Sequence, residues 1–280
     1  MFDTLTIIAP GLLGASLAMA AHQKKLARKI AIYARRQEAV DALNEQPWCD
    51  FASTDLTAAC QDSDMIVLCA PVERIITLAE QIAPGLSRNP IVTDVGSVKA
   101  DIVQRCETAL AGKARFVGSH PMAGSEKTGM ENACSDLFEQ RVCFVTPSHA
   151  TDPQALQTTV AFWKAVGSTV LEETPDNHDR IVAQVSHLPH LLASALASFL
   201  QSSQPRAGDL CGNGLRDTTR IASGHPELWG QIVSQNRKEI LRAIADFQSH
   251  LSAVSDAIAS ENDAQVLDML SRGKQFRDSL

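Results

Sequence analysis

Short apolar runs alternate with longer amphipathic segments along the first 171 residues of the chain. Compact runs of aliphatic residues bounded by polar or glycine-rich stretches predict strands, and the segments between most of them have helical periodicity. The predicted strands cover residues 5–8, 30–33, 65–69, 91–94, 116–118, 142–146 and, at the end, 169–171. This alternation of strand and helix is typical of an α/β protein with a parallel, doubly wound sheet.

The chain changes character after a turn-like segment that contains Pro175 and Asp176. From His178 onward no strand pattern is convincing, while apolar residues recur at helical spacing, as in Leu228, Trp229, Ile232, Val233, Ile240, Leu241, Ile244, Phe247 and Leu251. We therefore predict a sheet domain over 1–174 and an all-helical domain over 175–280. The apolar stripe fits burial within its own domain or against a second copy, and we expect a homodimer formed through this domain.

Composition narrows the class of partners. The 280 residues carry a formal net charge of −7, with 45% hydrophobic and 20% charged residues, which is ordinary for a globular protein and gives no general affinity for nucleic acid. No apolar run reaches the ~18 residues of a membrane span, and the start lacks a signal-peptide pattern, so we expect a cytoplasmic protein. The seven cysteines show no C-x-x-C pairing, and we expect reduced thiols without a metal site or disulfide framework.

A glycine-containing turn follows the first predicted strand, in the sequence IIAPGLLGAS at residues 7–16. It resembles the dinucleotide-binding pattern G-x-G-x-x-G with Ala9, Gly11 and Gly14 at the glycine positions. Alanine fits the first position if its φ is negative, and Ser16 with the helix amides would face the phosphates. We predict cofactor contacts from Gly11, Leu12, Leu13 and Gly14. The alternative is a plain turn between a strand and a helix.

The end of the second predicted strand bears on the choice of cofactor. About 20 residues after the last glycine, NAD-selective proteins carry an acidic residue that binds the ribose diol. Here Ala34 stands with Arg35 and Arg36, whose guanidinium groups are suited to a 2′-phosphate. We therefore predict NADP as the preferred cofactor, with NAD possible. The alternative is that both arginines are only solvated.

Two further loops follow predicted strands: CAP at residues 69–71 and DVGSVK at residues 94–99. Ligands of open α/β sheets bind at the carboxyl ends of the strands, so these loops should converge on the nicotinamide. Ala70, Pro71 and Ser97 are the predicted contacts. An equally good interpretation of Ser97 is a cap of the following helix.

Five segments together resemble one enzyme family. They are APGLLGASLA at 9–18, DVGSVK, GSHPMAGSEKTG at 118–129, SHLPH at 186–190 and GLRDTTRIASGHPELW at 214–229. In this order and spacing they look like the prephenate and arogenate dehydrogenases of tyrosine biosynthesis. The resemblance implies oxidative decarboxylation of a cyclohexadiene. A hydride leaves the carbon that bears the ring hydroxyl, carbon dioxide leaves the opposite carbon, and the ring becomes aromatic.

The resemblance also implies roles for individual residues. His120 matches the catalytic histidine, and a neutral imidazole can accept the hydroxyl proton. Ser97 matches a serine that contacts the same hydroxyl or the nicotinamide. Substrate-binding positions match Ser125, Glu126, His187, His190 and, as the carboxylate anchor, Arg220. For His187 and His190 a structural role remains an open alternative. For His178 a structural role is favoured. Trp229 is better explained as a core residue, and Arg216 as a member of an ion pair.

The substrate preference depends on the side chain, which carries a keto group in prephenate and an ammonium group in arogenate. Glu126 could hold the ammonium, whereas His225, which stands where many family members have an acidic residue, would not help. In the family that the chain resembles, NADP use is more often seen with arogenate, so arogenate is the first choice, with acceptance of both substrates next. Two other functions stay open: a related dehydrogenase of the β-hydroxyacid type, and a non-catalytic dinucleotide sensor suggested by Ala9.

Overall fold

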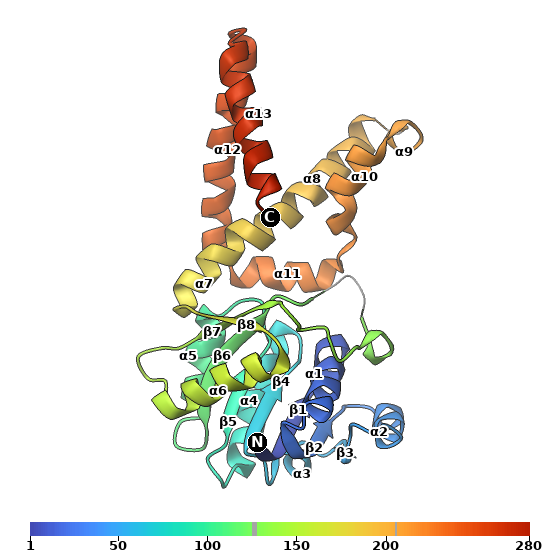
Figure 1. Ribbon diagram of the computed structural model, residues 1–280, viewed down its shortest axis with the longest axis vertical. Helices are drawn as coiled ribbons and strands as arrows, with labels where there is room; N and C mark the ends of the chain where they lie inside the picture. Colours follow the sequence, from blue (N-terminus) through green and yellow to red (C-terminus); the bar gives the residue numbers. More distant parts are fainter. Residues whose placement is uncertain (125–127, 205) are drawn as a thin grey trace.

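An eight-stranded sheet forms the N-terminal part of the computed structural model, which describes residues 1–124, 128–204 and 206–280. The strand order is β3-β2-β1-β4-β5-β6-β7-β8 (Figure 1). The strands are β1 (Phe2–Ile8), β2 (Ala27–Tyr33), β3 (Phe51–Ser53), β4 (Met65–Leu68), β5 (Ile91–Asp94), β6 (Arg115–Pro121), β7 (Val142–Thr146) and β8 (Thr169–Glu172). All the predicted strands are present, and the short edge strand β3 was missed.

The prediction of a parallel sheet is correct for β1 to β6 but wrong for the last two strands. β7 runs antiparallel to β6, with Gly118 opposite Thr146, and β8 runs parallel to β7. A parallel pair needs a long crossover connection, usually a helix. Between β6 and β7 the described residues contain only one short 3-10 turn, η2 (Met130–Asn132), so the chain returns antiparallel.

Helices cover both faces of this sheet. They are α1 (Leu12–Gln23), α2 (Gln37–Asn44), α3 (Leu56–Cys60), α4 (Val72–Ile82) with the 3-10 turn η1 (Ala83–Gly85), α5 (Ala100–Ala109) and α6 (Pro153–Val166). Successive strand residues enter opposite cores: Ile7 packs in the cluster that contains Trp163 of α6, and Ile8 packs with Ile75 of α4. Because both faces are buried, the central strands are continuous apolar runs rather than alternating ones.

The rest of the described chain is helical, as predicted. The elements are α7 (Pro175–Val182), η3 (Ala183–His187), α8 (Leu188–Ser203), α9 (Ala207–Leu210), α10 (Asn213–Thr219), η4 (Arg220–Ser223), α11 (Pro226–Gln235), α12 (Arg237–Ala259) and α13 (Asp263–Asp278). α11 lies across the sheet domain and contacts α4, while α12 and α13 stand side by side away from it (Figure 1). None of the helices in the described ranges is both long and apolar enough to cross a membrane.

A wide turn joins α7 to α8. The helical course of the SHLPH segment begins upstream, at Pro175, and passes through the π-helical turn η3 before Pro189. Pro189 has no N–H to donate, and its ring needs room beside the preceding turn, so a π turn fits it without ending the helix. His187 and His190 thereby stay near each other on the side of α11, where both rings contact Trp229.

Candidate active site

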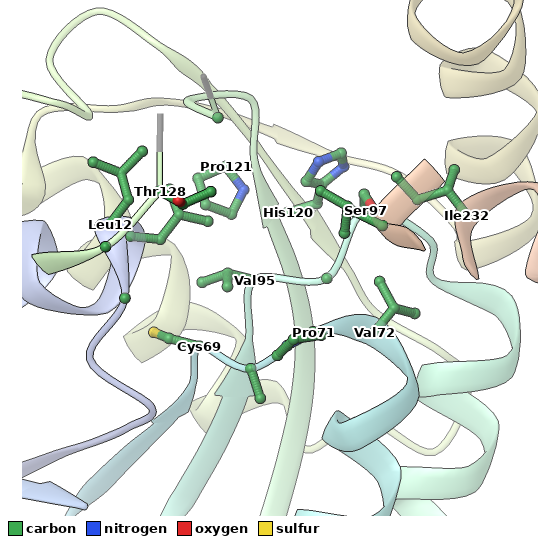
Figure 2. A pocket seen from close by; sticks show the side chains of 17 residues that line it. Leu12, Cys69, Pro71, Val72, Val95, Ser97, His120, Pro121, Thr128 and Ile232 are labelled. Atoms are coloured by element: carbon green, nitrogen blue, oxygen red, sulfur yellow. The ribbon is translucent and has the colours of Figure 1, made fainter. Parts of the chain in front are cut away.

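A cavity of about 360 Å³ lies at the carboxyl ends of β1, β4, β5 and β6. Predicted cofactor contacts form much of its wall: Gly11, Leu12, Leu13, Ala70, Pro71 and Ser97. His120 shares this wall, and Leu228 and Ile232 of α11 contribute to it from the helical domain. Figure 2 shows His120 and Ser97 between Leu12 and Thr128 on one side and Ile232 of α11 on the other. The predicted convergence of the strand-end loops is therefore present in the structure.

The first position of the glycine turn is left-handed. Ala9 has a φ of 68°, in the region that alanine disfavours, so the condition of a negative φ, under which alanine would fit without strain, is not met. The turn needs this conformation because the Ala9 N–H donates to the Tyr33 carbonyl at 3.1 Å and the Ala9 carbonyl accepts from the Gly11 N–H at 2.9 Å. The chain thus keeps the shape of the motif at the cost of local strain.

The other two motif glycines have distinct environments. A Cβ at Gly14 would lie 2.7 Å from the Ala9 carbonyl oxygen and 3.1 Å from the Cys69 Cβ, so this glycine lets α1 pack on the sheet. A Cβ at Gly11 would meet no atom within 4 Å, and Gly11 caps the N-terminus of α1. Open space before a helix N-terminus suits a pyrophosphate. These residues therefore fit a dinucleotide.

Ser16 does not face this space. Its side chain is buried, and its Oγ accepts the Cys134 N–H at 3.0 Å. The expectation that it faces the phosphates was wrong, because the second turn of α1 has already rotated toward the segment that follows β6. Ser16 instead ties α1 to that segment.

The arginine pair follows β2 directly. Ala34 is buried, whereas Arg35 and Arg36 are exposed, and Arg36 is the N-cap residue of α2. None of the ion pairs found among the described residues uses either guanidinium group. Because Tyr33 at the end of β2 hydrogen bonds to Ala9, the arginines begin next to the glycine turn.

His120 lies near the end of β6, opposite Phe144 of β7, and is 8% exposed. Its Nδ1 lies 2.9 Å from Nε2 of His178, and Nδ1 of His178 lies 2.8 Å from Oδ1 of Asp179. Burial lowers the pKa of His120 well below its usual value of 6.5, and burial also lowers the pKa of His178. Both rings are therefore neutral near pH 7. His178, for which a structural role was favoured, is buried and contacts the ring of His120 directly.

Asp179 reaches from α7 to the N-terminus of α5. Its Oδ1 accepts the Lys99 N–H at 2.7 Å, and its Oδ2 accepts the Ala100 N–H at 2.9 Å. The helix begins at Ala100 with Lys99 as its N-cap residue, so the interpretation of Ser97 as a helix cap was wrong. Asp179 does the capping, and the half-buried Ser97 lies on the cavity wall.

A buried ion pair lies beneath the same region and was missed by the sequence analysis. Lys99 and Asp94 are fully buried and paired, and Lys99 Nζ also donates to the Ser119 carbonyl at 2.9 Å. Asp94 further accepts the N–H groups of Gly96 and Ser119 at 2.8 and 3.0 Å. Asp94 and Lys99 are the first and last residues of the DVGSVK loop, and their opposite charges could have predicted this ion pair.

His187 and His190 meet Trp229 of α11. The rings of His190 and Trp229 are stacked at 3.5 Å with 7° between their planes, and His187 meets Trp229 edge-on at 6.1 Å. His187 Nδ1 lies 3.2 Å from Nδ2 of Asn236, which also donates to the Asp179 carbonyl at 2.8 Å. Burial lowers the pKa of His187 to about 4, and burial lowers that of His190. Neither ring is among the groups that form the cavity wall described above.

The remaining predicted residues are less closely associated with the cavity. Arg220 begins η4 and is exposed, as is Arg216 in α10, and neither forms part of the cavity wall among the described residues. Ser125 and Glu126 lie outside the described residues. All seven cysteines are free thiols, three of them buried, and no group of metal-ligating side chains occurs within the described ranges.

Comparisons with known proteins agree across the whole chain. Residues 17–172 match the family model "Prephenate dehydrogenase, nucleotide-binding domain", and residues 174–272 match "Prephenate dehydrogenase, dimerization domain". The chain is 30% identical to the prephenate dehydrogenase of Bacillus subtilis, covering 100% of this chain and 76% of the relative. It is 27% identical to the cyclohexadienyl dehydrogenase of Zymomonas mobilis, covering 100% and 97%.

Two solved structures extend this agreement to the fold. Prephenate dehydrogenase from Aquifex aeolicus in complex with hydroxyphenyl propionate and NAD+ superposes with a TM-score of 0.93 at 30% identity, covering 99% of this chain and 98% of that one. Synechocystis arogenate dehydrogenase superposes with a TM-score of 0.87 at 30% identity, covering 99% of both chains.

Proposed function

Because this chain belongs to the prephenate dehydrogenase family, we propose that it oxidatively decarboxylates arogenate, prephenate or both, with NADP as its preferred cofactor and arogenate as its preferred substrate. The observation that carries the proposal is the position of His120. Its neutral ring forms part of a cavity whose opposite wall is the dinucleotide-type glycine turn. A base and a cofactor site thus face a single space.

The chemistry divides between the cofactor and the chain. A bound nicotinamide would supply the acceptor for the hydride that leaves the carbon bearing the ring hydroxyl. His120 accepts the hydroxyl proton, so that the carbonyl can form, and the bond to the carboxylate at the opposite carbon then breaks with its electron pair entering the ring. His120 returns the proton to the same oxygen, which has become a phenolate. Ser97, beside His120 on the wall, orients the hydroxyl.

The cofactor contacts we propose come from the strand-end loops. Gly11, Leu12 and Leu13 would hold the pyrophosphate at the start of α1, with Gly14 behind them, and Ala70 and Pro71 would contact the nicotinamide side. Arg35 and Arg36 would bind the 2′-phosphate, supported by their exposure and by the absence of an acidic residue at the end of β2.

For the substrate we propose contacts from both domains. Arg220 would anchor a carboxylate and Glu126 an ammonium group, while Ser125, His187 and His190 would complete the pocket. The pairing of His187 and His190 around Trp229 supports a shared role for these two histidines. Since Arg220 lies outside the cavity wall, its role requires movement of the helical domain or a second subunit.

We also propose that the helical domain, residues 175–280, forms a homodimer. The two family matches meet between residues 172 and 174, and the second is a dimerization domain. The long helices of this domain present exposed apolar side chains suited to a second copy: Leu241, Leu251, Ile258, Leu267 and Leu270.

The test is reduction of NADP and of NAD, each with arogenate and with prephenate, followed at the nicotinamide absorbance band. We expect the highest kcat/KM with NADP and arogenate. His120→Ala should lower kcat at least about a hundredfold, the scale of general base catalysis, while the Kd for NADP stays nearly unchanged. His149→Ala, at an exposed loop histidine, is the matched control.

Three outcomes would contradict parts of this proposal. Preference for prephenate would contradict the proposed role of Glu126 and would make His225 and His190 the candidates for determining the choice of substrate. Loss of NADP binding in His120→Ala would make His120 a structural residue. Cofactor binding with no turnover of either substrate would replace the dehydrogenase with a dinucleotide sensor, the function that the strained Ala9 turn suggests.

A further inference from the structure

A continuous buried chain of hydrogen bonds leads from the cavity to a helix end in the sheet domain. It runs from His120 on β6 to His178 and Asp179 on α7, and from Asp179 to the backbone of Lys99 and Ala100 at the start of α5. His120, His178 and Asp179 are each less than a tenth exposed. Water therefore has little access to this chain, and its members determine one another's proton positions.

Asp179 determines which atom donates in each hydrogen bond from His178 to His120. Its two carboxylate oxygens accept backbone N–H groups, one each, and the N-terminus of a helix favours negative charge. A carboxylate only accepts hydrogen bonds, so Nδ1 of His178 must donate to Oδ1. A neutral imidazole carries one proton, so Nε2 of His178 has none and can only accept. Nδ1 of His120 must then be the donor across the 2.9 Å contact.

The consequence appears at the other nitrogen of His120. With the proton on Nδ1, Nε2 carries a lone pair, which is what a general base needs. We propose that His178 and Asp179 are positioning residues that hold His120 in its Nδ1–H tautomer, with Asp179 anchored on the N-terminus of α5. This inference rests on the proposed function for its catalytic consequence, but the tautomer is a property of the resting protein.

The other charged and titratable groups near the chain are already engaged. Lys99 Nζ pairs with Asp94 and donates to the Ser119 carbonyl. His187 accepts from Asn236, and the same Asn236 amide holds the Asp179 carbonyl on α7. Phe144 packs edge-on against His178 at 5.1 Å and offers no hydrogen bond. The carboxylate of Asp179 is thus the group that orients His178.

The hydrogen bonds of Asp179 also connect the helical domain to the sheet domain. Asp179 belongs to α7, the first helix of the helical domain, whereas its N–H donors belong to α5 of the sheet domain. If α7 moved away from α5, His178 would lose its orienting carboxylate and His120 its fixed tautomer. The proton-accepting form of His120 is therefore maintained only while α7 is seated on α5.

The direct experiment measures the tautomers in the unliganded wild-type protein. In histidine labelled with 15N, a protonated ring nitrogen and a lone-pair nitrogen have well-separated shifts, and the His120→Gln and His178→Gln variants assign the signals. We expect a protonated Nδ1 and a lone-pair Nε2 in both rings at pH 7.5. A protonated Nε2 in His120 would overturn the proposal, whatever the protein turns over.

The second experiment uses Asp179→Asn, with Asp176→Asn as the matched control, since Asp176 is an exposed carboxylate on the same helix. An amide in place of the carboxylate can donate to His178 and reverse the chain. In the serine protease triad, replacing the aspartate by asparagine acts through the wrong histidine tautomer in this way. We expect Asp179→Asn to show a protonated Nε2 on His178, and kcat to fall at least about a hundredfold with KM changed less than about threefold.

Each result of the second experiment has one meaning. A fall in kcat that only matches a loss of folded protein, as judged by circular dichroism, would leave Asp179 with a purely structural role and overturn the proposal. Unchanged tautomers and unchanged kcat would do the same. If Asp179→Asn does not fold, the wild-type tautomers decide. If the wild type turns over neither cyclohexadiene, the proposed function fails, while the tautomer measurement still decides this inference.

Discussion

Acid should destabilise this protein through its buried histidines, and His187 allows the effect to be worked out. Its side chain is 1% exposed, and its pKa is lowered from 6.5 to about 4 because burial disfavours the charged ring. His187 therefore binds a proton near pH 6.5 in the unfolded chain but only near pH 4 in the folded chain. Above pH 6.5 the titration of His187 does not lower the unfolding free energy. Between pH 6.5 and pH 4 the unfolding free energy falls, and below pH 4 this residue causes no further loss.

The size follows from the two pKa values. Each pKa difference of one corresponds to about 1.4 kcal/mol, so the full loss is about 3 kcal/mol, and between pH 7 and pH 5 it is about 2 kcal/mol. His120 and His178 have lowered pKa values as well and add to the loss with the same sign. A globular domain has about 5–15 kcal/mol of stability in total, so this loss is readily measured.

The assay is urea unfolding at pH 7 and pH 5, at one protein concentration because the proposed dimer would add a concentration-dependent contribution to stability. The difference in unfolding free energy between the two pH values is compared for wild type, His187→Gln and His250→Gln. We expect His187→Gln to reduce this difference by about 2 kcal/mol, since glutamine does not titrate. His250 is exposed, and its variant should match wild type. An equal pH dependence in all three proteins would refute the reasoning.

Three further substitutions test local features. Ala9→Gly should raise the unfolding free energy by about 0.5–1 kcal/mol, because relief of left-handed strain exceeds the added chain entropy; urea unfolding measures it, and a loss would contradict the strain. Lys99→Met should cost about 3–5 kcal/mol by leaving Asp94 buried without its partner, whereas exposed Lys113→Met should stay within about 0.5 kcal/mol. Gly14→Ala should lower the unfolding free energy by about 1–3 kcal/mol, because the new Cβ overlaps the Ala9 carbonyl. Gly11→Ala should leave the unfolding free energy unchanged and weaken NADP binding in a fluorescence titration. Equal losses of unfolding free energy in the two variants would refute the assigned roles.

The sheet was largely predictable because burial on both faces gives each central strand an uninterrupted apolar run. β3 was not, since Phe51–Ser53 is too short to stand out and is held by pairing with β2. The antiparallel return of β7 was also missed. Strand direction depends on what lies in the connection, and the segment after His120 offers no helical pattern of the usual length.

The site was predictable where one residue type serves one chemical need. Gly11, Ser97 and His120 fall on the cavity wall, as their positions at strand ends imply. Ala9 shows the limit of such reasoning, because the sign of φ depends on hydrogen bonds to Tyr33 and Gly11 that the sequence does not reveal. Asp179 was missed for a similar reason: its partners, Lys99 and Ala100, are about eighty residues earlier in the chain.

The distribution of these groups explains why both parts of the chain are needed. The sheet domain supplies the glycine turn and His120, which line the same cavity. The helical domain supplies the carboxylate that is proposed to orient the histidine pair, and the α11 residues Leu228 and Ile232 that line one part of the cavity. A hydride acceptor without an oriented base would leave the hydroxyl proton in place and the carbonyl unformed. In the proposed mechanism, the contact of α7 with α5 is therefore as necessary as the cofactor site.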